Sequence, residues 1–330
     1  MTQSIPNPVV LAGATGYIGR AVARTLTARG YPVLALVRCH SEAAGIDELA
    51  GCELREVEVT DAAALSGVLR GLTGGAFISC LASRSGVAED AWRVDYQANV
   101  HLLAQAQHAE ASRFVLLSAL CVQKPRLAFQ EAKLAFEHLL MESGISYSVV
   151  RPTAFFKSLS GQLGRVRDGK PFLVFGGGTE TACKPISERD LANYLVDCLE
   201  RRDLTDRVLP IGGPGPALTP RDQGHLLFEL LDRPPRFRSV PVGLFKVAGA
   251  VLNVLGKLLP RMAAKAELAR IGHYYATESM LVWDKTTQQY SADATPETGE
   301  DTLREHYQQI IHHGLKGHEL GAHKVFSGGD

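Results

Sequence analysis

Short apolar runs alternate with longer amphipathic segments through the first half of the chain. Each short run is rich in large or β-branched residues and predicts a buried strand, at 9–12, 31–37, 76–79, 113–118 and 147–151. Residues 53–59 alternate between apolar and polar and predict a further strand, and helical spacing is found at 20–28, 62–69, 92–109 and 129–141. Strands that alternate with helices in this way predict an α/β fold built on a doubly wound parallel sheet.

The alternation becomes irregular beyond Pro152, where two further helices are predicted at 187–199 and 219–231. Ligands of doubly wound sheets bind at the carboxyl ends of the strands, so we expect this part of the chain to contribute a substrate site there. We predict a smaller C-terminal substrate lobe at 156–314, interleaved with the last sheet elements, and a mobile tail at 315–330.

Charge and cysteine content argue against several classes of protein. The 330 residues include 35 Lys and Arg against 35 Asp and Glu, so no net positive charge is available to attract nucleic acid. The six cysteines lack C-x-x-C spacing and predict neither a metal site nor a disulfide framework. Residues 1–8 are too short and polar for a targeting peptide, and no apolar run is long enough to span a bilayer. We therefore expect a cytoplasmic protein with reduced thiols.

A glycine-rich segment, G-A-T-G-Y-I-G, directly follows the first predicted strand. Gly13 permits a tight turn, Gly16 lets the backbone approach a pyrophosphate, and Gly19 lets the next helix pack closely on the strand. The N–H groups and the dipole at the start of that helix attract phosphate. The spacing G-x-x-G-x-x-G resembles that of extended and atypical short-chain dehydrogenases. We assign the loop to a dinucleotide site formed by Gly13, Thr15, Gly16, Tyr17, Ile18 and Gly19.

The end of the second predicted strand indicates which nicotinamide cofactor is bound. An NAD-dependent enzyme carries a carboxylate there, but this chain carries Arg38 and has no carboxylate until Glu42. Arg38 can pair with a 2′-phosphate, or it can be an ordinary solvated arginine. Asp61 follows the third strand and can meet the adenine, cap the next helix, or do both. We predict NADPH as the cofactor and a Rossmann domain over residues 1–155.

The catalytic pattern of the short-chain dehydrogenases is incomplete in this chain. That group shares a Y-x-x-x-K pair on the helix after the fifth strand, and here Phe129 and Lys133 take the two positions. Ser118 matches the serine of the group, and Asn99 matches a structural asparagine. A phenylalanine cannot protonate an alkoxide, so ordinary carbonyl reduction is disfavoured. Two alternatives remain: an NADP(H)-binding sensor or scaffold of the NmrA-like type, or a reductase in which Ser118 and Lys133 are catalytic and no tyrosine is needed.

Several longer strings resemble a single family. They are S-A-L-C-V-Q-K-P at 118–125, F-Q-E-A-K at 129–133, V-R-P-T-A-F-F-K-S at 150–158, T-A-C-K-P-I-S at 181–187, P-I-G-G-P at 210–214 and Y-Y-A-T-E-S-M at 274–280. Together they resemble the NADPH-dependent divinyl chlorophyllide a 8-vinyl-reductases, from about residue 9 to 314. The resemblance implies reduction of the ring B vinyl group of divinyl chlorophyllide a or divinyl protochlorophyllide a to ethyl, in chlorophyll or bacteriochlorophyll synthesis.

The remaining predicted site residues follow the fourth and sixth strands. We expect further cofactor contacts from Leu81, Ala82, Pro152, Thr153 and Phe155. Phe155 and Phe156 can wall a flat macrocycle or pack in the core.

The charged candidates for the substrate site have plain structural alternatives. Lys157 and Lys184 can bind the propionate of the substrate or be solvated, and His273 can ligate its magnesium or be structural. Residues 245–262 form an apolar stretch with lysines that can contact a membrane surface, cover the pigment pocket or pack as core.

Overall fold

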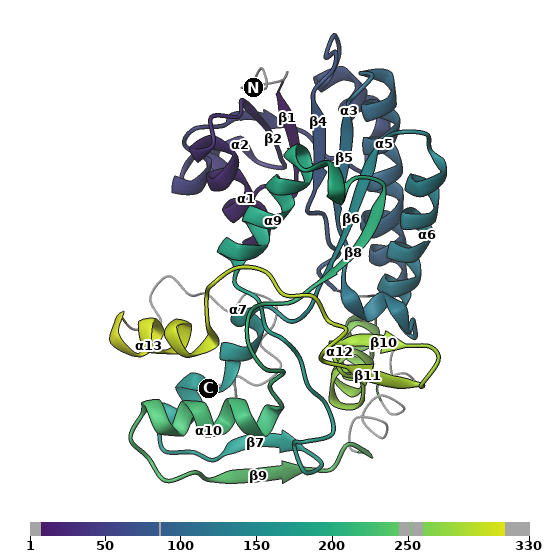
Figure 1. The fold of residues 1–330 in the computed structure, drawn as a ribbon. Coiled ribbons are helices and arrows are strands. Elements are labelled where there is room, and N and C mark those ends of the chain that lie inside the picture. Colours follow the sequence, from purple (N-terminus) through teal and green to yellow (C-terminus); the bar gives the residue numbers. More distant parts are fainter. Residues whose placement is uncertain (1–7, 86, 244–251, 253–259, 314–330) are drawn as a thin grey trace. The chain divides into compact units, whose positions relative to one another are not determined.

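The computed structural model describes residues 8–85, 87–243, 252 and 260–313 (Figure 1). The chain divides into two compact units. The first unit comprises residues 1–83, 88–151 and 188–209, and the second comprises 84–87, 152–187 and 210–330. The chain therefore leaves the first unit after residue 151 and returns to it at residue 188. The tail at 315–330 and most of the stretch at 245–262 lie outside the described residues.

The sheet of the first unit has seven strands in the order β3-β2-β1-β4-β5-β6-β8. They are β1 (Val9–Ala12), β2 (Val33–Val37), β3 (Glu53–Glu56), β4 (Ala76–Ser79), β5 (Arg113–Leu117), β6 (Tyr147–Pro152) and β8 (Arg207–Ile211). The neighbouring pairs from β3 to β6 are parallel. The strand order reverses between β1 and β4, and such a switch point is where doubly wound sheets bind their ligands. The predicted α/β, doubly wound fold is confirmed.

Helices cover both faces of this sheet (Figure 1). Helices α1 (Tyr17–Ala28) and α9 (Glu188–Glu200) pack together on one face, and α3 (Ala62–Val68), α5 (Asn99–His108) and α6 (Ala128–Glu142) lie on the other. The shorter helices are α2 (His40–Ala44), α4 (Ala88–Ala91) and the 3₁₀ turns Asp47–Leu49, Leu120–Gln123 and Arg202–Leu204.

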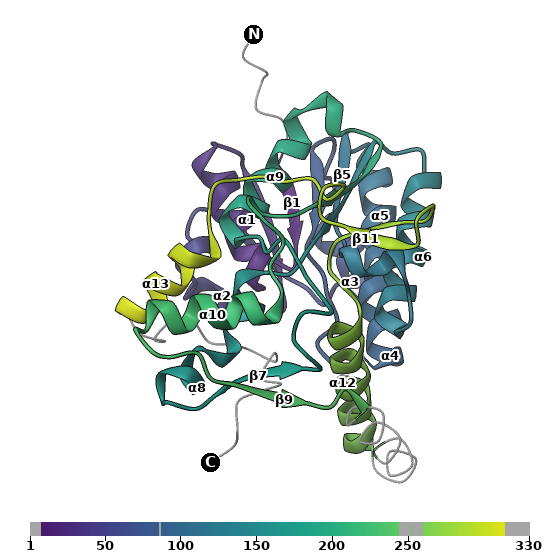
Figure 2. The ribbon, with the colours of Figure 1, turned by 60° about the horizontal axis from the view of Figure 1, so that its bottom comes forward.

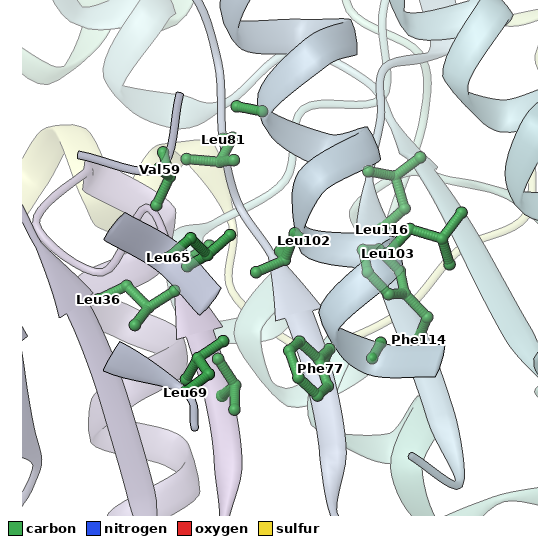
Figure 3. Close-up of a cluster of buried hydrophobic side chains, with 14 of the residues drawn as sticks. Leu36, Val59, Leu65, Leu69, Phe77, Leu81, Leu102, Leu103, Phe114 and Leu116 are labelled. Atoms are coloured by element: carbon green, nitrogen blue, oxygen red, sulfur yellow. The ribbon is translucent and has the colours of Figure 1, made fainter. Parts of the chain in front are cut away.

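The main core of the first unit lies between the sheet and the second group of helices (Figure 3). Phe77 and Phe114 extend from β4 and β5 toward Leu65 of α3 and Leu102 of α5, and all four side chains are buried. Full burial of a side chain of this size contributes about 1.5–3 kcal/mol. This packing fixes the ends of the strands, and the loops that carry the candidate site follow those ends.

Two segments differ from the predicted elements. The strand predicted at 53–59 ends at Glu56. β3 lies at the edge of the sheet and pairs with β2, which itself ends at Val37, so the pairing stops after the Val57 N–H donates to the carbonyl of Val37. The helix predicted at 92–109 begins as a π-helix, Trp92–Ala98, before α5 continues it.

The second unit contains two small strand pairs. β7 (Phe172–Phe175) and β9 (Phe237–Val240) are parallel, and β10 (Val282–Asp284) and β11 (Gln289–Ser291) are antiparallel. Helix α10 (Pro220–Leu230) lies along β7 in both views (Figures 1 and 2). The other helices are α7 (Phe156–Leu159), the 3₁₀ turn Ser160–Gln162, α8 (Leu163–Arg167), α12 (Pro260–Thr277) and α13 (Leu303–His313). Within the described ranges, no helix has the length and apolar character needed to cross a membrane.

Candidate cofactor and active site

The glycine loop between β1 and α1 is shaped by two close backbone approaches. Gly13 has a φ of +78°, and a Cβ at this position would lie 2.6 Å from the carbonyl oxygen of Cys80. A Cβ on Gly19 would overlap the carbonyl oxygen of Gly13. The Gly16 N–H donates to that same carbonyl at 3.0 Å, which closes the turn. The loop therefore requires glycine at positions 13 and 19 for steric reasons alone.

The start of helix α1 is suited to an anion. Gly16 is the N-cap residue, no side chain of the described residues caps this end, and the first turn contains no acidic residue. The N–H groups there have the positive end of the helix dipole behind them. Arg20 holds the loop by donating a hydrogen bond from Nε to the carbonyl oxygen of Thr15 at 2.9 Å. The Tyr17 hydroxyl donates a hydrogen bond to Glu188 at 2.5 Å. This end of α1 fits the pyrophosphate of a dinucleotide.

Strand register brings the next predicted residues to the same edge of the sheet. Ala12 of β1 pairs with Leu36 of β2 and with Ser79 of β4, so the segments that follow these strands lie side by side. Arg38 therefore comes one strand away from the glycine loop on one side, and Leu81 and Ala82 come one strand away on the other. Arg38 is exposed and makes no hydrogen bond or ion pair within the described chain.

Asp61 caps helix α3, which is one of its two predicted roles. Its Oδ1 accepts hydrogen bonds from the backbone N–H groups of Ala63 and Ala64 at 2.9 and 3.0 Å. The residue is exposed. A contact to the adenine is compatible with this geometry, because the carboxylate has a second oxygen, and that contact stays a prediction.

Ser118 and Lys133 belong to a buried polar cluster at the ends of β4 and β5. The Ser118 hydroxyl donates to Glu137, and Glu137 also forms an ion pair with Arg151, which donates from Nε at 3.1 and 3.2 Å. The Lys133 ammonium lies 3.0 Å from Oδ1 of Asp95 and donates to the carbonyl oxygen of Leu81 at 3.4 Å. The two carboxylates balance the two cations, so the cluster tolerates burial.

Two neighbours of Lys133 complete this region. Phe129 is half-buried and lies one turn before Lys133 on α6. Burial raises the pKa of the Cys80 thiol to about 12, although the nearby Lys133 charge opposes the shift. Cys80 is therefore a neutral thiol near neutral pH and does not act as a nucleophile there.

The predicted residues at the end of β6 and just after it belong to the second unit. The Thr153 N–H donates to Ile211 at 3.0 Å, its hydroxyl donates to the Lys184 carbonyl, and Phe155 forms a bridge with Ile186. Pro152 is buried, and Phe155 and Lys157 are half-buried. These bonds tie the segment after β6 to the strings at 181–187 and 210–214.

Among the predicted substrate residues, Phe156 takes the core role. Its side chain is 1% exposed and packs in the cluster that also contains Val166, Phe228 and Tyr307, with its ring centre 5.2 Å from that of His306. The ring therefore packs as core in the described residues, and its contact with the macrocycle stays a prediction. Phe155, which is half-buried, keeps that expectation.

Lys184 and His273 have internal contacts in the second unit. The Lys184 side chain is buried and forms an ion pair with Glu297, and this hydrogen bond holds the pKa of the Glu297 carboxyl below its ordinary value. His273 is half-buried on α12. No cluster of three or more His, Cys, Asp or Glu side chains suited to a metal occurs in the described part of the chain.

Comparison with known proteins identifies the family. The NAD(P)H-binding family model matches residues 13–202. The divinyl chlorophyllide a 8-vinyl-reductase of Cucumis sativus, a chloroplastic protein, is 47% identical over 332 residues, which cover 96% of this chain and 79% of that protein. The chain belongs to the divinyl chlorophyllide a 8-vinyl-reductase family. Membership confirms the resemblance seen in the sequence, and the family model bears out a nicotinamide cofactor of the predicted kind.

The chain also matches more distant proteins. The Photosystem II assembly factor Ycf39 of Trieres chinensis is 25% identical over 80% of this chain and 82% of its own length. A quinone oxidoreductase of Escherichia coli, solved with NADPH, has a TM-score of 0.64 at 18% identity and covers 92% of this chain and 99% of its own. At that identity the structural match shows the fold alone.

Sequence reasoning missed the carboxylates and the arginine of the buried cluster. Glu137 follows Lys133 by four residues, so helical spacing alone places both on one face of α6. Asp95 precedes Asn99 by four residues, but the π-helix between them has no signature in the sequence. Arg151 stands in the string V-R-P-T, and only the tertiary structure reveals its contact with Glu137.

Proposed function

We propose that this chain reduces the 8-vinyl group of divinyl chlorophyllide a or divinyl protochlorophyllide a to ethyl with NADPH. The observation that carries the proposal is 47% identity to a reductase of that name across 96% of the chain. The glycine loop and the buried Ser118 and Lys133 lie within the matched residues. The proposal places the chain in chlorophyll or bacteriochlorophyll biosynthesis.

The described residues fit NADPH at several points. The steric need for Gly13 and Gly19 suits a pyrophosphate, as does the start of α1, which no described side chain caps. Arg38 makes no hydrogen bond or ion pair with the described residues and suits a 2′-phosphate. When bound, NADPH supplies the hydride. The predicted cofactor-binding roles of Thr15, Tyr17, Ile18, Asp61, Leu81, Ala82, Pro152, Thr153 and Phe155 are also part of the proposal.

The absence of a tyrosine at position 129 is consistent with the chemistry proposed. A vinyl group conjugated to a macrocycle can spread the negative charge of reduction into the ring, so no strong acid is needed at a single oxygen. Ser118 and Lys133 then act mainly by position, and orientation of two reactants can supply a large part of a rate enhancement. The proton reaches the inner vinyl carbon from water or from a weak acid nearby.

The ion pair with Asp95 bears on the role of Lys133. As the acid, Lys133 would transfer a proton and leave the buried Asp95 carboxylate without its counter-charge, which costs free energy. This supports Lys133 as a group that binds the nicotinamide ribose, over Lys133 as the proton donor.

The substrate contacts and the location are also proposals. The candidates for contacts with the macrocycle, its propionate and its magnesium remain Phe155, Phe156, Lys157, Lys184 and His273. Lys184 would have to share its ammonium with Glu297. A cytoplasmic location and a peripheral contact with a photosynthetic membrane remain predictions, while the named plant relative is chloroplastic.

Turnover distinguishes this proposal from a sensor or scaffold, which the phenylalanine at 129 would also suit. Purified protein is incubated with NADPH and detergent-solubilised divinyl chlorophyllide a without dioxygen, and the pigment absorption is followed. We expect the absorption to shift to that of the monovinyl product. The Lys133→Met variant, which lacks the proposed ribose-binding group, should convert the pigment much more slowly. Tight NADPH binding without any conversion of pigment would favour the sensor, and lack of pigment binding would strengthen that case.

A further inference from the structure

The segment before α5 is wound as a π-helix, Trp92–Ala98. Such turns are rare and frequently accompany functional sites, because the wider winding redirects side chains. Asn99 fixes this turn by donating to the backbone carbonyl oxygens of Asp95 and Val94 at 3.0 and 3.4 Å. Asn99 in turn accepts a hydrogen bond from the Ser79 hydroxyl at 2.5 Å. The π-helix is therefore attached to the end of β4, beside the cofactor edge of the sheet.

One carboxylate of the π-helix, that of Asp95, lies in the interior of the first unit. Asp95 is 1% exposed, and its Oδ1 lies 3.0 Å from Nζ of Lys133, which is 8% exposed. Its Oδ2 accepts a long hydrogen bond from the Ser83 N–H at 3.4 Å. A carboxylate this deeply buried is costly unless it is paired, and Lys133 supplies the pairing charge.

The bonds of Lys133 leave part of its ammonium for a ligand. An ammonium has three N–H donors, and the described residues that it meets are Asp95 and Leu81. Lysine has a long flexible side chain, so a single anchor does not fix the direction of the remaining donor. Two anchors on different elements, the π-helix and the segment after β4, do fix it.

We propose that Asp95 is a positioning residue, which holds the Lys133 ammonium so that its remaining N–H meets the nicotinamide ribose of NADPH. The inference rests on the proposed role of Lys133 as a cofactor-binding group. Asp95 itself does not touch the cofactor and acts only through Lys133. Its removal should therefore have no effect on cofactor binding in a protein that already lacks Lys133.

A double-mutant cycle tests this dependence. The dissociation constant of NADPH is measured by fluorescence titration, without pigment, for the unmodified protein, Asp95→Asn, Lys133→Met and the double variant. We expect Asp95→Asn to weaken NADPH binding on the order of tenfold, because the ammonium loses the ion pair that holds it in place. The double variant should bind NADPH as Lys133→Met does.

Melting temperatures separate positioning from a merely structural role. Asp95→Asn leaves the Lys133 ammonium buried without its counter-charge and should lower the melting temperature, whereas the double variant should regain most of the loss. If only folding mattered, NADPH affinity would recover together with stability in the double variant. Glu89→Gln, which removes an exposed carboxylate from neighbouring α4, is the matched control and should change neither quantity.

Three results would overturn the inference: unchanged NADPH binding in Asp95→Asn, an equal further loss in the Lys133→Met background, or unchanged binding in Lys133→Met itself. Failure of the proposed function has a different signature, because it would appear as NADPH binding without pigment reduction. The titrations contain no pigment, so they remain decisive in that event.

Discussion

At the scale of single residues, Arg38 shows how one side chain can set cofactor preference. It follows the buried strand β2, is exposed, and makes no hydrogen bond or ion pair with any described residue. A guanidinium in this position can form a forked contact with a 2′-phosphate, which NADH lacks. We predict that Arg38→Ala raises the KM for NADPH on the order of tenfold or more and changes the KM for NADH little.

Steady-state kinetics with both cofactors measure this difference. Arg70→Ala is the control, because Arg70 is also exposed but lies before β4, at the opposite end of the strands. It should leave both KM values unchanged. Equal use of NADPH and NADH by the unmodified protein would contradict the assigned role of Arg38.

Phe129 offers a second prediction at this scale. It lies one turn before Lys133, where a short-chain dehydrogenase carries its tyrosine, so Phe129→Tyr would restore a phenol to the site. If charge delocalisation makes a strong acid dispensable, kcat for divinyl chlorophyllide a should stay within about twofold of its original value. Single-turnover rates at saturating NADPH measure the step. A large gain in rate would show that a phenolic proton donor is useful here.

At the scale of elements, the packing of β1 against α1 depends on the lack of a side chain at Gly19. A Cβ on Gly19 would overlap the carbonyl oxygen of Gly13, so Gly19→Ala must displace either the loop or the helix. We predict weaker NADPH binding and a loss of stability of about 1–3 kcal/mol, typical of overpacking. Urea unfolding and NADPH titration measure the two effects.

Gly67 provides the opposite case within α3. A Cβ there would meet nothing within 4 Å, and its φ lies outside the left-handed region. Gly67→Ala should therefore stabilise the protein by about 0.5–1 kcal/mol and leave NADPH binding unchanged. If Gly19→Ala and Gly67→Ala changed stability and NADPH binding alike, close packing at Gly19 would not be what the loop requires.

The elements that sequence could predict are those determined by local pattern. Buried strands such as β1 and β4 are short apolar runs between turn residues, and the glycine loop follows β1 with the expected spacing. The π-helix could not be predicted, because its stability comes from Asn99 and its contacts with β4. The partners of Ser118 and Lys133 likewise depend on which elements meet in space, and the core position of Phe156 depends on the packing of the second unit.

At the scale of the whole molecule, buried thiols make the free energy of unfolding depend on pH in the alkaline range. Burial raises the pKa of Cys183 in the second unit and of Cys198 in the first from 9.0 to about 12. Below pH 9 both states hold these protons, but between pH 9 and 12 the unfolded chain releases them and the folded chain does not. Stability should therefore fall as pH rises through this range, by about 1–2 kcal/mol per thiol near pH 10.5.

Urea unfolding at pH 8 and pH 10.5 tests this dependence. Cys198→Ala should reduce the difference in unfolding free energy between the two pH values by about the share of one thiol. Cys39→Ala, which removes a partly exposed thiol, should leave the difference unchanged. If Cys198→Ala and Cys39→Ala reduced this difference equally, burial would not be the cause of the raised pKa of Cys198.

The return of the chain to the first unit at residue 188 has a consequence for synthesis on the ribosome. Helix α9, which packs on α1, and most of strand β8, which borders β6, are translated only after the whole excursion through 152–187. The nascent cofactor-binding unit therefore emerges with an open sheet edge and an uncovered α1, and it stays incomplete until translation has passed residue 209. A gene fragment ending at residue 151 would encode a unit that lacks α9 and β8 and cannot be completed.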